Sequence, residues 1–151
     1  MSTKNLLCGM ECEFSKLTEI WEFFNFPGIH FGTGYFSVAD AAVYSKGKRI
    51  ALPSEFGPSF FQELIQCCFV CERLVLQLYP ANSPTSEIDS YTDYIQSNCK
   101  MVILMCDCYY LEIYCKDHVW LQTLLHTAKE MPGVIVKEKY EDTDPRTRMY
   151  V

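Results

Sequence analysis

The chain has 151 residues, of which 49% are hydrophobic and 21% charged, and its net charge is −6 at pH 7. This composition is that of a folded globular protein and excludes a disordered chain. A chain of this length can bury roughly 70% of its unfolded surface, so it needs neither a metal nor a disulfide to fold. The acidic balance argues against nucleic-acid binding, because proteins that bind phosphate backbones usually concentrate Lys and Arg.

Residues 5–14 predict a first strand, because polar and apolar side chains alternate along them. The apolar side of this alternation is formed by Cys8, Met10, Cys12 and Phe14. An amphipathic helix is expected over 16–25, ended by Pro27-Gly28. The apolar runs are too short for a signal peptide or a membrane-spanning helix, so we expect a cytoplasmic protein with no membrane association.

Three short strands are expected next, at 34–38, 41–45 and 48–52, with a hairpin turn at Lys46-Gly47. A helix is expected over 58–72, because Pro58 is tolerated in a first helical turn. Its buried stripe is expected to hold Phe61, Leu64, Ile65, Cys68 and Cys71. The Cys-x-x-Cys motif then falls near the helix C-terminus, where the helix dipole opposes a thiolate, and this position argues against redox activity.

The second half of the chain alternates strands and helices. The expected strands cover 73–79, 99–106, 109–115, 134–140 and a short terminal segment. One expected helix covers 91–97 and begins with a Ser90–Asp93 capping box. The other covers 118–131 and is capped by Asp117. The longer helix is expected to bury Val119, Leu121, Leu124, Leu125 and Ala128. This order predicts one α+β domain over 1–151, with a largely antiparallel or mixed sheet and three to four helices packed mainly on one face.

Four of the nine cysteines lie at Cys99, Cys106, Cys108 and Cys115, a density that suggests metal ligands. A hairpin with Asp107-Cys108 at its turn, and with Cys106 opposite Tyr109, gives a consistent apolar face. That face holds Val102, Leu104, Cys106, Tyr109, Leu111, Ile113 and Cys115. In this hairpin Cys106 and Cys115 lie roughly 20 Å apart, and Cys99 and Cys106 lie on opposite faces. Zinc ligands must all lie within about 2.3 Å of one point, so we expect free core thiols, no metal and no cofactor.

Among the polar clusters in the sequence, the one in the C-terminal tail most resembles a binding site. In an extended segment Arg146 and Arg148 project to the same side, where two guanidinium groups can hold a carboxylate or a phosphate. The alternative is that these arginines pair with neighbouring acidic residues on a solvated edge. The candidate ligand-binding residues are Asp107, Tyr110, Asp144, Arg146 and Arg148. No spacing of Cys, His or Ser selects a catalytic set, so no catalytic residue is predicted.

Residues 91–117, followed by a helix and by Thr-Asp-Pro-Arg-Thr-Arg-Met at 143–149, resemble a known family. It is a domain-of-unknown-function family of small, uncharacterised cytoplasmic proteins from Gram-positive bacteria. The features that match are Asp107, Tyr109 or Tyr110, the run 113–117, and Asp144 with Arg146-Thr147-Arg148. The resemblance covers the C-terminal half best, implies a single-domain bacterial protein and brings no catalytic residue with it.

Two functions are consistent with these features. A small, acidic, cysteine-rich α+β protein without catalytic motifs has the profile of a non-enzymatic protein-binding module, similar to bacterial immunity proteins, and is expected to have an acidic or aromatic surface patch. The alternative is a small-ligand binder or enzyme with a pocket where the tail, with Arg146 and Arg148, meets the 106–110 turn. The lack of a catalytic set favours the protein-binding module. The oligomeric state stays open.

Overall fold

A computed structural model describes residues 6–67, 69–142 and 146–149. The helices in these ranges are α1 (Leu17–Phe24), α2 (Pro58–Gln66), α3 (Tyr91–Gln96) and α4 (His118–Glu130). The strands are β1 (Leu7–Glu13), β2 (Tyr35–Ser45), β3 (Lys48–Arg49), β4 (Glu55–Phe56), β5 (Val70–Tyr79), β6 (Met101–Cys106), β7 (Tyr110–Cys115) and β8 (Ile135–Tyr140).

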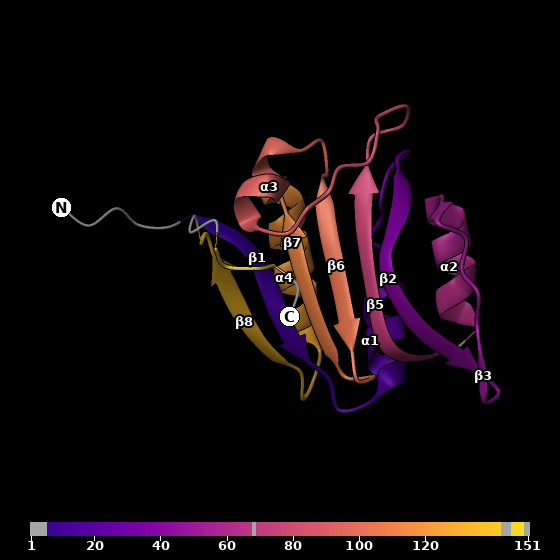
Figure 1. The fold of residues 1–151 in the computed structure, drawn as a ribbon. Helices are drawn as coiled ribbons and strands as arrows, with labels where there is room; N and C mark the ends of the chain where they lie inside the picture. Colours follow the sequence, from indigo (N-terminus) through magenta and orange to yellow (C-terminus); the bar gives the residue numbers. More distant parts are fainter. Residues whose placement is uncertain (1–5, 68, 143–145, 150–151) are drawn as a thin grey trace.

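These strands form one sheet in the order β3-β2-β5-β6-β7-β1-β8 (Figure 1). β4 pairs with the start of β2, whereas β3 pairs with its end. Every strand pair in the described residues is antiparallel. The predicted α+β fold with a largely antiparallel sheet is therefore confirmed.

Three helices, α1, α2 and α4, cover one face of the sheet and form the main core with it. Each helix contributes an apolar stripe, and the sheet contributes alternate residues of its central strands. The largest of these sheet residues are Leu74, Leu76, Leu78, Met101, Ile103, Met105, Leu111 and Ile113. The expected packing of helices mainly on one face is confirmed.

The opposite face carries a second, smaller core under α3, the 80–90 loop and the end of the tail. Its buried residues are Cys8, Val75, Tyr79, Ile88, Tyr91, Tyr94, Cys99, Val102, Leu104, Tyr114 and Met149. The predicted capping box of α3 is present, because the Asp93 amide donates to Ser90 Oγ at 3.2 Å and the Ser90 amide donates to Asp93 Oδ2 at 3.2 Å. These segments cover only part of this face.

Several predicted boundaries were wrong. The two strands expected at 34–38 and 41–45 are one continuous strand, β2, which bulges between Val38 and Asp40. The helix expected over 58–72 ends at Gln66, because Val70 and Cys71 instead pair with β2 at the start of β5. Cys71 is thus a strand residue, and Cys68 lies outside the described residues.

The register predicted for the 99–115 hairpin was wrong by one residue. Asp107 and Cys108 both have positive φ, 56° and 65°, and the loop takes three residues, so Cys106 pairs with Tyr110 and not with Tyr109. A shift of one residue moves a side chain to the other face of the sheet. Cys106 and Cys115 therefore lie on opposite faces, whereas Cys99 and Cys106 both adjoin the second core.

Val119 was expected inside and is 79% exposed. It precedes Leu121 by two residues, about 200° around the helix, so it projects away from the buried stripe of α4. The other four residues predicted for this stripe are buried: Leu121, Leu124, Leu125 and Ala128.

Candidate functional site

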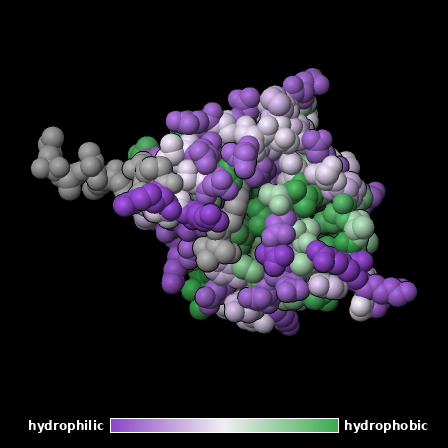
Figure 2. Space-filling view, viewed as in Figure 1, coloured by the Kyte–Doolittle hydropathy of each residue, from purple (hydrophilic) through white to green (hydrophobic). Residues whose placement is uncertain are grey.

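The strand register lines up side chains in rows across the face opposite the three helices. One row runs from β8 to β2 through Lys137, Glu11, Glu112, Leu104, Val75 and Asp40. The next row runs through Ile135, Glu13, Tyr110, Cys106, Arg73 and Ala42. In Figure 2, which shows this face, exposed hydrophobic groups lie over β6, β5 and β2 among charged ones. This half of the face is charged and accessible, whereas the helix-covered face is a sealed core.

A hollow of about 600 Å³ lies over β2, β5 and β6 and is bounded by the 85–89 loop. We call it the acidic groove. Its lining residues are Ser37, Ala39, Asp40, Glu72, Arg73, Val75, Gln77, Thr85, Ser86, Glu87, Ile88, Asp89, Leu104, Cys106 and Asp107. Five of these residues carry a carboxylate and one carries a guanidinium, so the groove has a marked negative balance.

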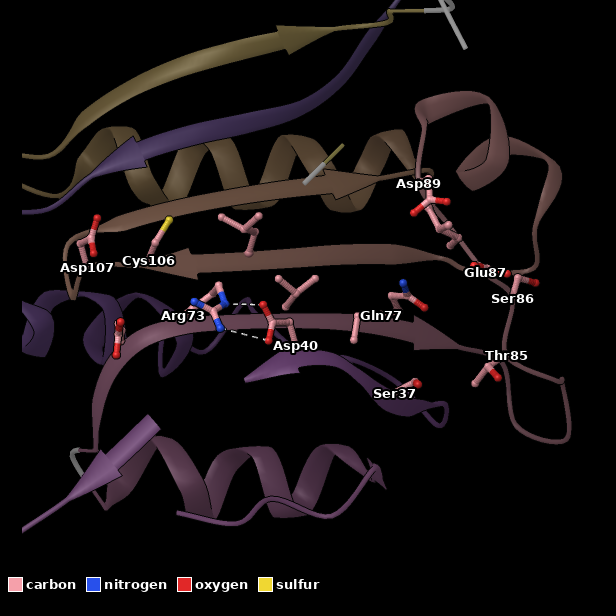
Figure 3. Close-up of a pocket in the computed structure, with 15 residues that line it drawn as sticks. Ser37, Asp40, Arg73, Gln77, Thr85, Ser86, Glu87, Asp89, Cys106 and Asp107 are labelled. Atoms are coloured by element: carbon pink, nitrogen blue, oxygen red, sulfur yellow. Dashed lines mark hydrogen bonds and ion pairs between the residues drawn. The ribbon is translucent and has the colours of Figure 1, made fainter. Parts of the chain in front are cut away.

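An ion pair between Asp40 and Arg73 crosses the middle of the acidic groove (Figure 3). Arg73 Nε donates to Asp40 Oδ2, and Nη2 donates to Oδ1 at 3.4 Å. The hydrogen bond from Arg73 to Asp40, together with the charge of Asp40, raises the pKa of Arg73. The bulge in β2 places Asp40 opposite Val75, from where its carboxylate reaches the neighbouring arginine. The only guanidinium among the described lining residues is thus already neutralised.

The two ends of the acidic groove are both acidic. Asp107 lies with Cys106 at one end, and Glu87 and Asp89 lie at the other (Figure 3). The Asp107 end is fixed by the backbone, because the Asp107 amide donates to the Glu72 carbonyl at 2.9 Å. Between the ends, Val75 and Leu104 form an apolar floor that shares the second core.

Buried Gln77 borders this floor. The Tyr79 hydroxyl donates to Gln77 Oε1 at 2.6 Å, and the Ser86 amide donates to the Tyr79 hydroxyl at 3.0 Å. These bonds tie the 85–89 loop to β5 and hold that wall of the groove in place.

A second hollow of about 250 Å³, which we call the tail hollow, lies over β7, β1 and β8 beneath the end of the tail. Lys139 lies beside it and bonds two carboxylates: its Nζ is 2.9 Å from Glu11 Oε1 and 2.7 Å from Glu112 Oε1. Burial lowers the pKa of Lys139, but its hydrogen bonds to Glu112 and Glu11 outweigh burial, and the net shift is upward. Lys139 Nζ also lies 5.2 Å from the centre of the Tyr114 ring.

Tyr110 extends the network of the tail hollow. Its hydroxyl donates to Glu112 Oε2 at 3.0 Å, and burial and the nearby Glu112 carboxylate raise its pKa. Because Cys106 pairs with Tyr110, and Leu104 with Glu112, the acidic groove and the tail hollow adjoin across the β6–β7 pair. The linings of the two hollows therefore contain neighbouring residues of this strand pair.

The predicted ligand-binding residues do not gather at one point. Tyr110 and Arg148 line the tail hollow, and Asp107 lines the acidic groove. Arg146 is exposed and is not among the residues that line either hollow, and Asp144 lies outside the described residues. The tail is held by the Met149 amide, which donates to the Asp89 carbonyl at 2.8 Å, and by the buried Met149 side chain.

Sequence reasoning missed four charged residues that shape this surface: Asp40, Arg73, Glu112 and Lys139. The alternation of Arg73, Val75 and Gln77 in β5 was the available signal, because it places all three on one face. Nothing local in the sequence indicates that Asp40 reaches Arg73, since the two meet only through the β2–β5 pairing.

The described residues contain no group of three or more His, Cys, Asp or Glu side chains placed to hold a metal ion. Their cysteines are free thiols, most of them buried. None of the helices in the described ranges is both long and apolar enough to cross a membrane.

Comparisons with known proteins agree with the resemblance seen in the C-terminal half. Residues 63–150, more than half of the chain, match the family model described as protein of unknown function (DUF2691). The chain is 25% identical over 95 residues to the uncharacterized protein YncE of Bacillus subtilis (strain 168), an alignment that covers 63% of this chain and 62% of YncE. The alignment therefore spans less than two thirds of that relative. No solved structure matches the chain significantly. The chain belongs to the DUF2691 family of proteins of unknown function.

Proposed function

We propose that this protein is a non-enzymatic protein-binding module and that the uncovered half of its sheet is the docking surface. The observation that carries the proposal is the contrast between the two faces of one sheet. Three helices seal one face, and the other is left with the acidic groove and the adjoining tail hollow. Concave surfaces of this kind are the default location of binding sites.

The chemistry of the groove supports binding rather than catalysis. Its carboxylates lie at its two ends, and the central Asp40 is paired with Arg73. Burial raises the pKa of Cys106, so its thiol is a poor nucleophile at neutral pH. The negative balance suits a basic protein partner, because complementary charge speeds association and sets orientation.

Blocking the groove tests the proposal. Ala39 is exposed and lines the groove, so Ala39→Trp fills it without touching the main core. The matched control is Gln122→Trp, at an exposed position on α4. Tagged wild-type and variant proteins would each be used to capture partners from lysate of the source bacterium, followed by mass spectrometry.

The proposal predicts a partner that wild type and Gln122→Trp retain and that Ala39→Trp loses. If the partner set of Ala39→Trp matches that of wild type, or if Gln122→Trp loses the same partner, the groove is not the docking surface. Equal thermal stability of the two variants is the check that both are folded.

One observation favours a second candidate function, a binder of small ligands. Tyr110 and Arg148, both predicted as ligand-binding residues, line the same tail hollow together with Tyr91, Tyr114 and Tyr140. Arginine suits a carboxylate or a phosphate, and tyrosine hydroxyls supply further hydrogen bonds. A thermal-shift screen of small carboxylates and phosphates tests it. A stabilising compound whose effect is lost in Arg148→Ala would support this function, and a screen with no such compound would remove it.

A further inference from the structure

We infer that the partner element for the acidic groove is an amphipathic helix with basic residues at both ends. This inference rests on the proposed function, because it names the occupant of the same docking surface. It follows from three properties of the groove: the hydrogen bonding of its floor, its length and the placement of its charges.

The floor offers no backbone partner to an extended segment. β5 is paired with β2 on one side and with β6 on the other, and β6 is paired in turn with β7. An extended peptide gains affinity by adding a strand to a free sheet edge, and the groove has none at its floor. A helix satisfies its own backbone N–H and C=O groups and needs only side-chain contacts.

Helices already pack in this way on the other face of the sheet. There, α4 lies against the sheet and buries Leu121, Leu124, Leu125 and Ala128. The groove extends along β5 from Glu72 to Gln77, five residue steps or about 17 Å. About 11 residues of α-helix span the same length, or roughly three turns.

The charges define the ends of that helix. Glu72 and Asp107 are joined by a backbone hydrogen bond at one end, and Glu87 and Asp89 lie at the other end (Figure 3). Between them the floor is apolar, and Arg73 is held by Asp40. A helix with Lys or Arg in its first and last turns therefore matches the acidic groups at both ends of the groove, and its apolar centre faces the neutralised Asp40–Arg73 pair and the floor of Val75 and Leu104.

Fluorescence anisotropy with a defined probe tests this inference. The probe is a labelled synthetic peptide of about 14 residues with leucines at helical spacing and lysines in both terminal turns. The groove variant is the double substitution Glu87→Gln with Asp107→Asn, because asparagine tolerates the positive φ of Asp107. The matched control is Glu22→Gln with Glu63→Gln, two exposed positions on α1 and α2 that are not among the groove-lining residues.

We expect the lysine peptide to bind wild type and the control equally, and to bind the groove variant about tenfold more weakly, since two exposed ion pairs are removed. Three results overturn the inference: no binding to wild type, equal binding to the groove variant, or equal binding by a peptide of the same composition whose helix is broken by proline. A peptide with Glu in place of Lys should not bind. These peptide measurements test the kind of partner element only. Whether the groove is the docking surface is tested separately, by the capture experiment with Ala39→Trp.

Discussion

Glu11 and Glu112 lie directly opposite each other in the β1–β7 pair, and Lys139 of β8 bonds both carboxylates. Two like charges in this position are destabilising in a sheet unless a cation lies between them. Glu112 is only 8% exposed, so water cannot take over the role of the lysine. The ion cluster at the tail hollow is thus a structural requirement of this sheet.

Replacing Lys139 by Met should therefore destabilise the fold by about 3 kcal/mol, because it leaves the largely buried Glu112 carboxylate without a compensating cation. Lys137→Met is the matched control, since Lys137 lies on the same strand and is exposed, and it should change stability by no more than about 0.5 kcal/mol. Urea denaturation measures both. Equal midpoints for the two variants would contradict the assigned role of Lys139.

Stability should be constant from about pH 7 to 8 and should fall at higher pH. Burial raises the pKa of the Cys12 thiol to about 12 and that of Cys115 to about 12, from 9.0. From about pH 8 upward the unfolded chain loses these protons while the folded chain keeps them, so unfolding is favoured. The raised pKa of Lys139 acts in the same direction above about pH 10.

Urea denaturation at several pH values between 7 and 11 measures this slope. Cys12→Ala should lower stability at every pH. It should also make the loss of stability above about pH 8 less steep, because one thiol with a raised pKa is removed. An unchanged slope in Cys12→Ala would show that this thiol does not contribute to the pH dependence.

The thiols should divide into two classes in the native protein. Cys67 is exposed, whereas Cys8, Cys12, Cys71, Cys99 and Cys115 are buried. Burial raises the pKa of Cys71 to about 12 and that of Cys99 to about 11, so these groups are neutral and inaccessible at pH 8. Brief labelling with iodoacetamide followed by peptide mapping should find Cys67 modified and the five buried cysteines unmodified.

Unfolding in denaturant should then expose all nine thiols in the sequence to the same reagent. Labelling of Cys12 or Cys115 as fast as Cys67 in the native protein would mean that the main core is not packed as described.

Gly9→Ala should be severely destabilising, by about 3 kcal/mol or more. A methyl group added at Gly9 would overlap the carbonyl oxygen of Ile113, a backbone atom that cannot move without disturbing the β1–β7 pair. Gly28→Ala is the control, because its nearest contact is an ordinary 3.5 Å to Thr123 and the expected change is within about 1 kcal/mol. Similar melting temperatures for the two variants would contradict the close approach of β1 and β7.

The sequence predicts this fold well where the pattern is local. Alternation in β1 correctly separated Met10 and Cys12 from Glu11, and the Ser90–Asp93 capping box correctly placed the start of α3. The alternation assigned Cys8 to the wrong face of the sheet. Cys8 belongs to the second core, because the bulge between Leu7 and Gly9 interrupts the alternation. A bulge depends on the neighbouring strand, which a single segment does not reveal.

The candidate site was much harder to predict, because it depends on pairing between distant segments. Asp40 and Arg73 meet only through the β2–β5 register, and Lys139 reaches Glu11 across 128 residues of sequence. A one-residue error in the predicted hairpin register also placed Tyr109, and not Tyr110, opposite Cys106. The predicted Arg148 and Tyr110 do share a hollow, but the acidic groove itself had no signal beyond the alternation in β5.

The proposed docking surface is the uncovered half of the sheet. The most direct measurement is an NMR titration of ¹⁵N-labelled protein with the captured partner, or with the lysine peptide. We predict that the amide signals of Arg73, Gln77 and Leu104 shift while those of exposed Gln122 and His126 on α4 stay in place. Shifts confined to α4, with the signals of Arg73, Gln77 and Leu104 unchanged, would contradict this proposal.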